Sequence, residues 1–245
     1  MSYKVDIYDN YVKHHITGLY RGVPDIKKIE SRFKDWKYYY TKFLPPSFEA
    51  SILDIGCGEG SFIYFLLGLG YKNASGIDIS NQQIELGRSL GIKNIECGDL
   101  YEHLSSGKKY DLIIARDILE HFTKQQVYDI SKLISNALLP GGKLLLQVPN
   151  GQGIFYTEVF YGDFTHEIAF THSSLEQVLG NVGFVEVKSF PINPAPHGIK
   201  AKIRLVLWLA FIGMVRTVKS FETGNRRGIY TRNLICLAEK KNNIA

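Results

Sequence analysis

SILDIGCGEGSF, at residues 51–62, joins a short apolar run to a second apolar stretch through three glycines at alternate positions. This pattern predicts a strand that passes through a tight turn into a helix. Glycine has no Cβ, so it tolerates positive φ and lets a ligand lie against the backbone, while the following helix presents free N–H groups. The turn is therefore predicted to bind a ligand.

Asp54 narrows the choice of ligand. In a phosphate or dinucleotide loop the amides and the helix dipole attract an anion, which a carboxylate two residues before Gly56 would repel. No Lys-Ser/Thr pair follows the last glycine, and Ser61 breaks the G-x-G-x-x-G spacing of the dinucleotide fingerprint. A cationic ligand without phosphate fits this turn better.

The segment 52–60 resembles motif I of the class I S-adenosylmethionine-dependent methyltransferases, in which Asp-x-Gly-x-Gly-x-Gly stands between apolar runs. S-adenosylmethionine carries an ammonium and a sulfonium group and no phosphate, which suits Asp54. The resemblance implies this cofactor and an α/β fold with a Rossmann-like, seven-stranded sheet and helices on both faces. It also implies cofactor contacts from five residues of this segment, which are Asp54, Gly56, Cys57, Gly58 and Gly60.

Further cofactor contacts are expected at the ends of the following strands. Asp78 ends the second predicted strand about 20 residues past the glycine turn, where an acid accepts hydrogen bonds from ribose hydroxyls in Rossmann-like sites. A surface acid at a strand end is the alternative interpretation. The resemblance implies that the residue after Asp78 packs on adenine, that Gly98-Asp99-Leu100 contacts adenine, and that the fourth strand ends at the methyl group. The residues concerned are Ile79, Asp99, Leu100, Arg116 and Asp117.

Two histidines are the catalytic candidates. The segment 114–122, IARDILEHF, resembles motif IV of the family, and the segment 161–171, YGDFTHEIAFT, resembles a loop found in ubiquinone-pathway O-methyltransferases and in methyltransferases of glycan gene clusters. Methylation of a hydroxyl needs a base, and imidazole titrates near neutral pH. His166 is the preferred base and His121 the second candidate, while a structural role for His166 in orienting its loop stays open.

A metal site is the other possibility weighed for this loop. Asp163, His166, Glu167 and His172 are all of metal-ligand types. The loop context argues against such a site, and no metal is expected.

Strand and helix patterns alternate along the core. Strands are predicted at 51–55, 74–79, 94–97, 110–115, 142–148, 185–187 and 234–238, and helices at 61–69, 81–90, 124–139 and from Ser173. Ser80 is the expected cap of the second of these helices, and Pro140-Gly141-Gly142 is expected to end the third in a turn. The alternation predicts a doubly wound parallel sheet.

Four regions are predicted. Residues 1–48 form an N-terminal helical cap, 49–190 the Rossmann-like cofactor-binding core, 191–232 a helical insertion and substrate cap, and 233–245 the last strand and tail. Residues 1–24 are interpreted as a short helix or a lid. Apolar residues at 26, 29, 33, 36, 40 and 43 predict one helical stripe that packs on the core and stops at Pro45-Pro46.

The insertion contains the most apolar stretch of the chain. Its uncharged part, residues 205–215, is 11 residues long, too short for a spanning helix, which needs roughly 18 to 20. Flanking Lys and Arg residues leave three environments open: burial in the fold, burial in a dimer, or a membrane interface. Burial in protein is preferred, and a peripheral membrane or dimer contact through residues 200–216 is the alternative. From residue 198 onward the sequence contains ten basic residues and two acidic ones. This excess of positive charge suggests an anionic partner or only a solvated surface.

The composition is that of a globular protein and excludes disordered and fibrous classes, with 45% hydrophobic and 22% charged residues in 245. One α/β domain with additions is expected. Three widely spaced cysteines and no C-x-x-C pair predict neither disulfides nor a zinc site and suit a reducing cytosol. The first residues lack an apolar signal-like region, so a cytoplasmic location is expected.

The sequence therefore predicts an S-adenosylmethionine-dependent methyltransferase. The preferred reaction is O-methylation of a sugar hydroxyl in bacterial glycan or polysaccharide biosynthesis, by in-line transfer with a histidine base. A phenolic or quinone-like acceptor is the alternative, and a nucleotide-dependent oxidoreductase is a remote one. We expect a small-molecule or glycan acceptor and no nucleic acid, because no recognition helix and no basic-aromatic platform are present.

Overall fold

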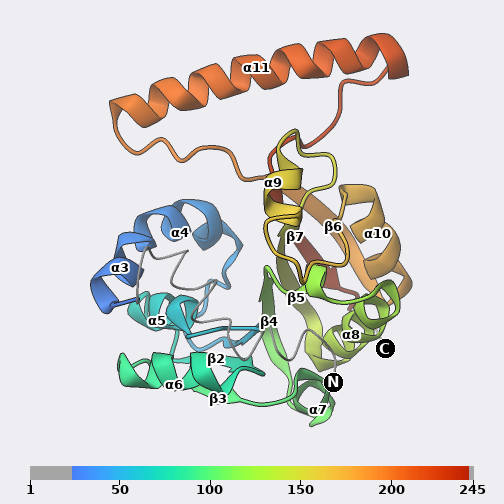
Figure 1. The fold of residues 1–245 in the computed structure, drawn as a ribbon. Helices are drawn as coiled ribbons and strands as arrows, with labels where there is room; N and C mark the ends of the chain where they lie inside the picture. Colours follow the sequence, from blue (N-terminus) through green and yellow to red (C-terminus); the bar gives the residue numbers. More distant parts are fainter. Residues whose placement is uncertain (1–23, 243–245) are drawn as a thin grey trace.

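A seven-stranded sheet forms the centre of the protein (Figure 1), which is described here by a computed structural model of residues 24–242. The strand order is β3-β2-β1-β4-β5-β7-β6. The strands are β1 Ser51–Ile55, β2 Asn73–Asp78, β3 Ile95–Cys97, β4 Tyr110–Arg116, β5 Leu138–Pro149, β6 Phe184–Pro191 and β7 Asn233–Lys240. All seven predicted strands are present, which confirms the expected methyltransferase-type α/β sheet.

The prediction of a parallel sheet is wrong for one strand. The strands β1 to β5 pair in parallel, but β7 lies antiparallel to both of its neighbours, β5 and β6. The physical reason is the route of the chain. The segment between β6 and β7 leaves the sheet and returns to it at the same end of the strands. No connection carries the chain back to the other end, so β7 must run in the reverse direction.

Helices cover both faces of the sheet (Figure 1). Alternate side chains of a strand point to opposite faces, so Ile52 and Ile114 pack in one core and Leu53 and Ile113 in the other. The first core lies under the helices between residues 26 and 89, and the second lies under α8 and α10. The helices of the core are α5 Ser61–Gly68, α6 Asn81–Ser89, α7 Leu100–Ser105, α8 Lys124–Ala137, α9 Tyr156–Phe160 and α10 His172–Asn181, with η3 at Leu119–His121.

The helix ends follow local chemistry. The Ser80 side chain accepts a hydrogen bond from the Gln83 N–H, as expected for the cap of α6, and Thr123 and Gln126 form a capping box at the start of α8. The expected turn at Pro140-Gly141-Gly142 is instead an irregularity within β5, where the pairing with β4 shifts register. The short helices α7 and α9 were not predicted, because five or six residues are too few to show a helical period.

The predicted N-terminal stripe is confirmed as a packing surface. It is divided between α3 Ile26–Ser31, α4 Phe33–Tyr40 and the short η2 Thr41–Phe43, so the predicted single helix is interrupted at Arg32. Ile29, Trp36 and Phe43 are buried in the core beneath α3 and α4. The prediction for residues 1–24 falls almost entirely outside the described part of the chain.

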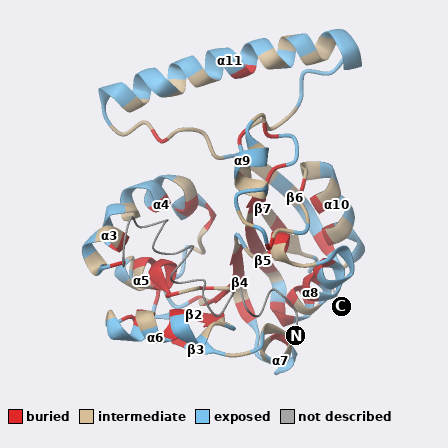
Figure 2. Cartoon of the chain, viewed as in Figure 1, coloured by how far each residue is buried: buried red, intermediate tan, exposed pale blue. Residues whose placement is uncertain are grey.

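The insertion before β7 is helical, as predicted, but it is not buried in the fold. Its helix, α11 Ile199–Thr223, stands apart from the sheet and the other helices (Figure 1), and Ile212 is its one buried residue (Figure 2). The preferred burial in protein is therefore wrong as burial within the fold, whereas burial in a dimer stays a prediction. Among the described residues, no helix combines the length and the apolar character that crossing a membrane requires.

Two leucines of β5 test the core. Leu145 is fully buried between β4 and β7, whereas Leu139 in the same strand is 37% exposed. We expect Leu145→Ala to lower the free energy of unfolding by about 2 to 5 kcal/mol, because it removes buried methyl groups and leaves a cavity. Leu139→Ala should cost less than about 1 kcal/mol. Urea unfolding measures both, and equal losses would contradict this description of β5.

Candidate active site

The glycine loop between β1 and α5 is fastened to the end of β2. Gly56, Gly58 and Gly60 have φ values of +67°, +58° and +81°, which other residues rarely adopt. The N–H groups of Gly56 and Cys57 donate to the Ile77 carbonyl oxygen over 2.8 and 3.1 Å. The predicted strand, turn and helix are thus present, and the turn is held by backbone hydrogen bonds.

Asp78 positions this loop. Its Oδ2 accepts a hydrogen bond from the Gly58 N–H at 2.9 Å, and its Oδ1 accepts one from the Ser80 N–H at 2.8 Å. Burial raises the pKa of the Asp78 carboxyl, although both hydrogen bonds favour its ionised form. The neighbouring Ile79 is 69% exposed, so its apolar side chain is available to pack against a ligand.

A cavity of about 710 Å³ opens at the carboxyl ends of β1, β2 and β4. This is where the strand order reverses, and ligands of open α/β sheets bind at such a point. Its lining includes eleven of the thirteen predicted site residues: Gly56, Cys57, Gly58, Asp78, Ile79, Asp99, Leu100, Arg116, Asp117, His121 and His166.

Asp54 and Gly60 lie outside that lining. Asp54 is buried beneath the loop, and within residues 24–242 its Oδ2 has no hydrogen-bond partner. Burial raises the pKa of Asp54 to about 7, against the opposing effect of the Arg116 guanidinium. Gly60 instead precedes α5 as its N-cap residue, where a Cβ would lie 2.7 Å from the Ile95 side chain.

Asp99 has a local partner of its own. Its Oδ1 accepts hydrogen bonds from the N–H groups of Tyr101 and Glu102, at 2.7 and 3.1 Å, and so caps α7. The cap fixes the carboxylate at the cavity wall beside Leu100, and the contact of Asp99 with adenine stays a prediction.

Arg116 and Asp117 leave β4 in different environments. The Arg116 guanidinium lies 3.8 Å from the centre of the Phe62 ring and 5.3 Å from that of Trp36, so aromatic side chains of α4 and α5 orient it. Asp117 has a φ of +54° and accepts hydrogen bonds from the side chains of Gln147 and Asn233. Burial raises the pKa of the Asp117 carboxyl, which the Arg116 charge opposes.

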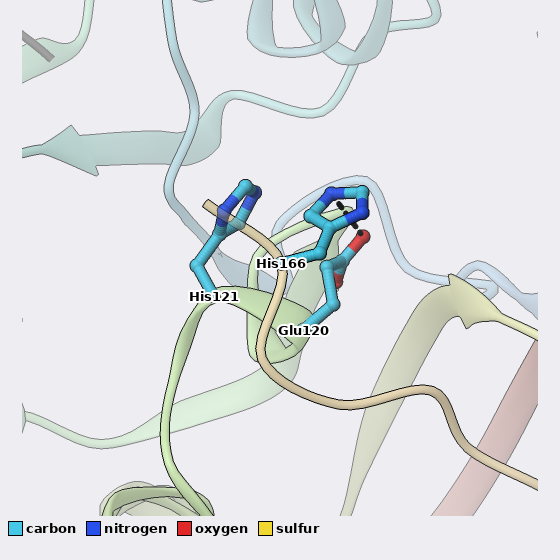
Figure 3. Close-up of side chains that lie close together, drawn as sticks. All are labelled: Glu120, His121 and His166. Carbon is cyan, nitrogen blue, oxygen red and sulfur yellow. Dashed lines mark ion pairs between the residues drawn. The ribbon is translucent and has the colours of Figure 1, made fainter. Parts of the chain in front are cut away.

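Glu120, His121 and His166 meet at one end of the cavity (Figure 3). His166 Nδ1 lies 3.1 Å from the Phe160 carbonyl oxygen, which can only accept, so Nδ1 carries the proton and Nε2 the lone pair. Thr165 donates its hydroxyl proton to Asp163, so it accepts from His121 Nδ1 at 2.7 Å. Both imidazoles are therefore held as the tautomer whose Nε2 can accept a proton or bind a cation.

Glu120 is the buried member of this cluster, with 1% exposure. Its Oε1 lies 4.0 Å from His166 Nε2, and no group of the described chain donates to its Oε2. Burial, together with the nearby charges of Asp117 and Asp163, raises the pKa of Glu120 well above its ordinary value.

The residues considered for a metal site do not all come together. His172 lies elsewhere, with its Nδ1 3.1 Å from Ser189 Oγ and its Nε2 3.9 Å from Glu176. The structure instead groups Glu120, His121 and His166, whose ligand atoms all lie within 4.8 Å of one another. Two imidazoles and a carboxylate are a donor set that can hold a divalent transition metal.

A comparison with protein families agrees with this geometry. Residues 29–189, which include the whole loop, the cavity floor and both histidines, match the family model described as a methyltransferase domain. The chain belongs to the class I S-adenosylmethionine-dependent methyltransferases. S-adenosylmethionine is accordingly its cofactor.

Sequence relatives of this methyltransferase match only parts of it. A ribosomal protein L11 methyltransferase of Shewanella baltica is 31% identical over 98 residues, which is 40% of this chain and 33% of that protein. A tRNA U34 carboxymethyltransferase of Aliivibrio salmonicida is 30% identical over 167 residues, which is 63% of this chain and 51% of that protein. The chain thus spans about a third to a half of these relatives' lengths, and the resemblance to polysaccharide- and ubiquinone-pathway enzymes stays a prediction.

Solved structures share the fold of the methyltransferase. A SAM-dependent methyltransferase from Archaeoglobus fulgidus superposes with a TM-score of 0.63 at 20% identity, over 92% of this chain and 98% of that one. Magnesium protoporphyrin IX methyltransferase from Synechocystis, solved with bound SAM, gives 0.56 at 15% identity over 98% of each chain. At these identities the likeness concerns the fold alone.

The cavity fits the cofactor on two local observations. The loop is a backbone cradle that side chains would fill, since a Cβ on Gly56 would lie 2.3 Å from Ile118 and one on Gly58 2.7 Å from Gln83 Oε1. Beneath it lies the buried Asp54 carboxyl, whose Oδ2 has no hydrogen-bond partner within the described part of the chain, and this suits a cationic ligand. Asp78 and Asp99 would then hold the ribose and the adenine.

Some site residues were missed from the sequence. Glu120 was visible in the Leu-Glu-His triplet, but nothing local indicated that it would be buried against His166. Asn233 reaches Asp117 only because β7 pairs beside β5. Arg32 also lines the cavity, which gives α3 and α4 a share in its roof as well as in the core.

Two glycines with the same backbone strain separate binding from stability. Gly58 and Gly91 both have positive φ, but a Cβ on Gly91 would meet nothing within 4 Å. We expect alanine at either position to cost about 1 to 2 kcal/mol of stability. Only Gly58→Ala should weaken S-adenosylhomocysteine binding, by at least about tenfold, because its Cβ enters the cradle. Calorimetric titration measures the difference, and equal affinities would remove the loop from the cofactor site.

Asp54 makes stability depend on pH. Its pKa in the fold, about 7, lies above the ordinary value of 3.8, so ionisation opposes folding. Its contribution to stability is complete below pH 3.8 and is lost as the pH rises through 7. Between those limits we expect the wild type to lose up to about 4 kcal/mol relative to Asp54→Asn, which cannot ionise. Urea unfolding of both proteins across this range is the measurement, and parallel stability curves would contradict the raised pKa.

Proposed function

We propose that the methyltransferase methylates a hydroxyl oxygen, with His166 as the proton acceptor and His121 beside it. The observation that carries the proposal is the pair of imidazoles at one end of the cofactor cavity, each oriented with Nε2 as its acceptor nitrogen. Bound S-adenosylmethionine supplies an electrophilic methyl group, whose transfer breaks the S–C bond, forms an O–C bond and releases the hydroxyl proton.

The surroundings of His166 support its role as base. The Phe160 carbonyl fixes the ring, and the imidazolium formed by proton uptake would face the Glu120 carboxyl across 4.0 Å. A base held in one tautomer and paired with an acid is the arrangement that general-base catalysis needs.

For the acceptor we propose a sugar hydroxyl of a glycan or polysaccharide precursor. The acceptor end of the cavity presents carboxylates and imidazoles from Glu120, Asp163, Glu158 and the two histidines. Such groups exchange hydrogen bonds with a polyhydroxylated ligand. One observation favours the alternative of a phenolic or quinone-like acceptor, because Tyr161 and Phe164 of the same loop are largely exposed and could stack on a ring.

A nucleic-acid acceptor is not expected, and this stays a prediction. The tRNA substrate named for one relative belongs to that protein. Consumption of the methyl donor, screened over nucleotide sugars, glycans, catechols and RNA with the purified protein, assigns the acceptor class. Turnover confined to catechols or to RNA would reject the sugar assignment.

His166→Ala tests the base directly. We expect kcat to fall by about a hundredfold or more, the usual contribution of a positioned base. Affinity for S-adenosylhomocysteine should change little, because His166 lies at the acceptor end. His172→Ala is the matched control, since that histidine lies outside the cavity, and it should keep full activity. Near-normal turnover of His166→Ala would exclude His166 from the mechanism.

Metal removal separates the two uses of the cluster. With His166 as a base, dialysis against EDTA should leave kcat unchanged. A loss of activity that added Mn²⁺ or Zn²⁺ restores would instead make Glu120, His121 and His166 metal ligands, and would overturn the assignment of His166 as base.

A further inference from the structure

Helix α11 has two unlike faces. Leu205, Trp208, Ile212 and Val215 follow one another at helical spacing and are at least partly buried. The segments on either side of the helix hold this inner stripe: Trp208 Nε1 donates to Asn193 Oδ1 at 3.1 Å, and Arg216 donates to the Gly228 carbonyl oxygen at 3.1 Å. The orientation of α11 about its own axis is therefore set.

The opposite face is apolar and exposed along the whole helix. Its side chains recur every three or four residues, which places them on one side of a 3.6-residue period. Ile199 at one end is 79% exposed, Leu207 near the middle 66%, and Phe221 at the other end 82%. The outer face, as we call it, consists of Ile199, Ile203, Val206, Leu207, Ala210, Met214, Val218 and Phe221. A continuous apolar face of this length, about 37 Å, marks an interaction surface.

Basic side chains border the outer face. Residues 199–227 contain seven Lys or Arg residues and one acid, Glu222. Lys200, Lys202 and Arg204 flank this face in the first two turns of α11, whereas Arg216 and Lys219 lie toward the segment 226–228 and donate hydrogen bonds to its carbonyl oxygens. Guanidinium groups bind phosphate oxygens through paired hydrogen bonds. The first turns of α11 thus offer an apolar strip with adjacent cations for phosphate groups.

We propose that α11 docks on the surface of an anionic phospholipid bilayer. The outer face lies in the boundary between headgroups and acyl chains, and Lys200, Lys202 and Arg204 beside it meet lipid phosphates. A helix that exposes an apolar face flanked by Lys and Arg binds the membrane interface through both features, by burial of apolar area and by attraction to anionic lipid. Because no described helix can span a bilayer, the contact is peripheral. This inference goes beyond the proposed function and does not depend on which acceptor is methylated.

Charge distinguishes lipid from the other occupants of this face. A second copy would bring like charges together in either orientation, because basic residues border both ends of α11 and Glu222 is its one acid. RNA would require basic groups at the centre of the contact, whereas the outer face has none between Arg204 and Arg216. An anionic lipid surface matches the apolar centre and the basic border at once.

Docking would also orient the active site. The segment containing α11 leaves and rejoins the sheet at the carboxyl ends of the parallel strands, where the cofactor cavity opens. Helix α9 lies on the side of the body that faces α11 (Figure 1). Glu158 and Val159 of α9 line the cavity. A bilayer bound to the outer face would therefore lie on the acceptor side of the enzyme.

Vesicle flotation of the full-length protein tests the proposal. We expect binding to vesicles of phosphatidylcholine mixed with phosphatidylglycerol and little binding to phosphatidylcholine alone. Leu207→Glu combined with Met214→Glu should weaken binding at least about tenfold, because two charges enter the apolar face. Tyr128→Glu on the exposed side of α8 is the control for adding a surface charge, and it should bind like the wild type.

A second variant tests the basic border. Lys202→Gln combined with Arg204→Gln should lower binding to the mixed vesicles by about tenfold, and the binding that remains should come from the apolar face. Affinity for S-adenosylhomocysteine, unchanged in all variants, shows that each protein is folded and keeps a failed docking test separate from a failed catalytic one.

Three outcomes would overturn the proposal. One is equal, weak binding of the wild type and of Leu207→Glu/Met214→Glu to both kinds of vesicle. Another is a concentration-dependent dimer in sedimentation that this double variant abolishes, which would assign the outer face to a second copy. The third is salt-sensitive RNA binding that Lys202→Gln/Arg204→Gln removes while vesicles remain unbound.

Discussion

The hydrogen bond from the Gly58 N–H to the Asp78 carboxylate is the constraint on which the cofactor cavity depends. It joins the loop after β1 to the end of β2, next to the two amides that donate to the Ile77 carbonyl. The loop can reach these partners only because its glycines adopt positive φ. The floor of the cavity is consequently made of backbone, and side chains enter from its rim.

Buried acids give that cavity its electrostatic character. Burial raises the pKa values of Asp54, Asp78, Asp117 and Glu120, and Arg116 is the cation that opposes the rise at Asp54 and Asp117. A raised carboxyl pKa means that lost hydration has not been fully replaced. A ligand that carries positive charge, as S-adenosylmethionine does, would supply the missing interaction and favour the ionised acids. The same burial that destabilises the empty protein at neutral pH thus favours a cationic cofactor.

The reversed direction of β7 connects the fold to the outer parts of the molecule. Because β6 ends and β7 begins at the carboxyl ends of the parallel strands, the whole intervening segment lies at the end of the sheet that carries the active site. The reversal brings Asn233 to Asp117 and leaves α11 held by its flanking segments, away from the core. One topological choice therefore shapes both the wall of the site and the exposed helix.

The sequence alone determined the glycine loop, the seven strands and most of the residues around the cofactor cavity. These features depend on local rules: glycine permits positive φ, strands alternate every two residues and helices repeat every 3.6. Tertiary structure decided the direction of β7, the meeting of Glu120 with His166, and the exposure of α11. Glu120 and His166 come from segments far apart in the chain, and an apolar helix has the same pattern whether protein, lipid or water covers it. Such outcomes follow from which surfaces lie opposite one another in space, and no local pattern of residues specifies that.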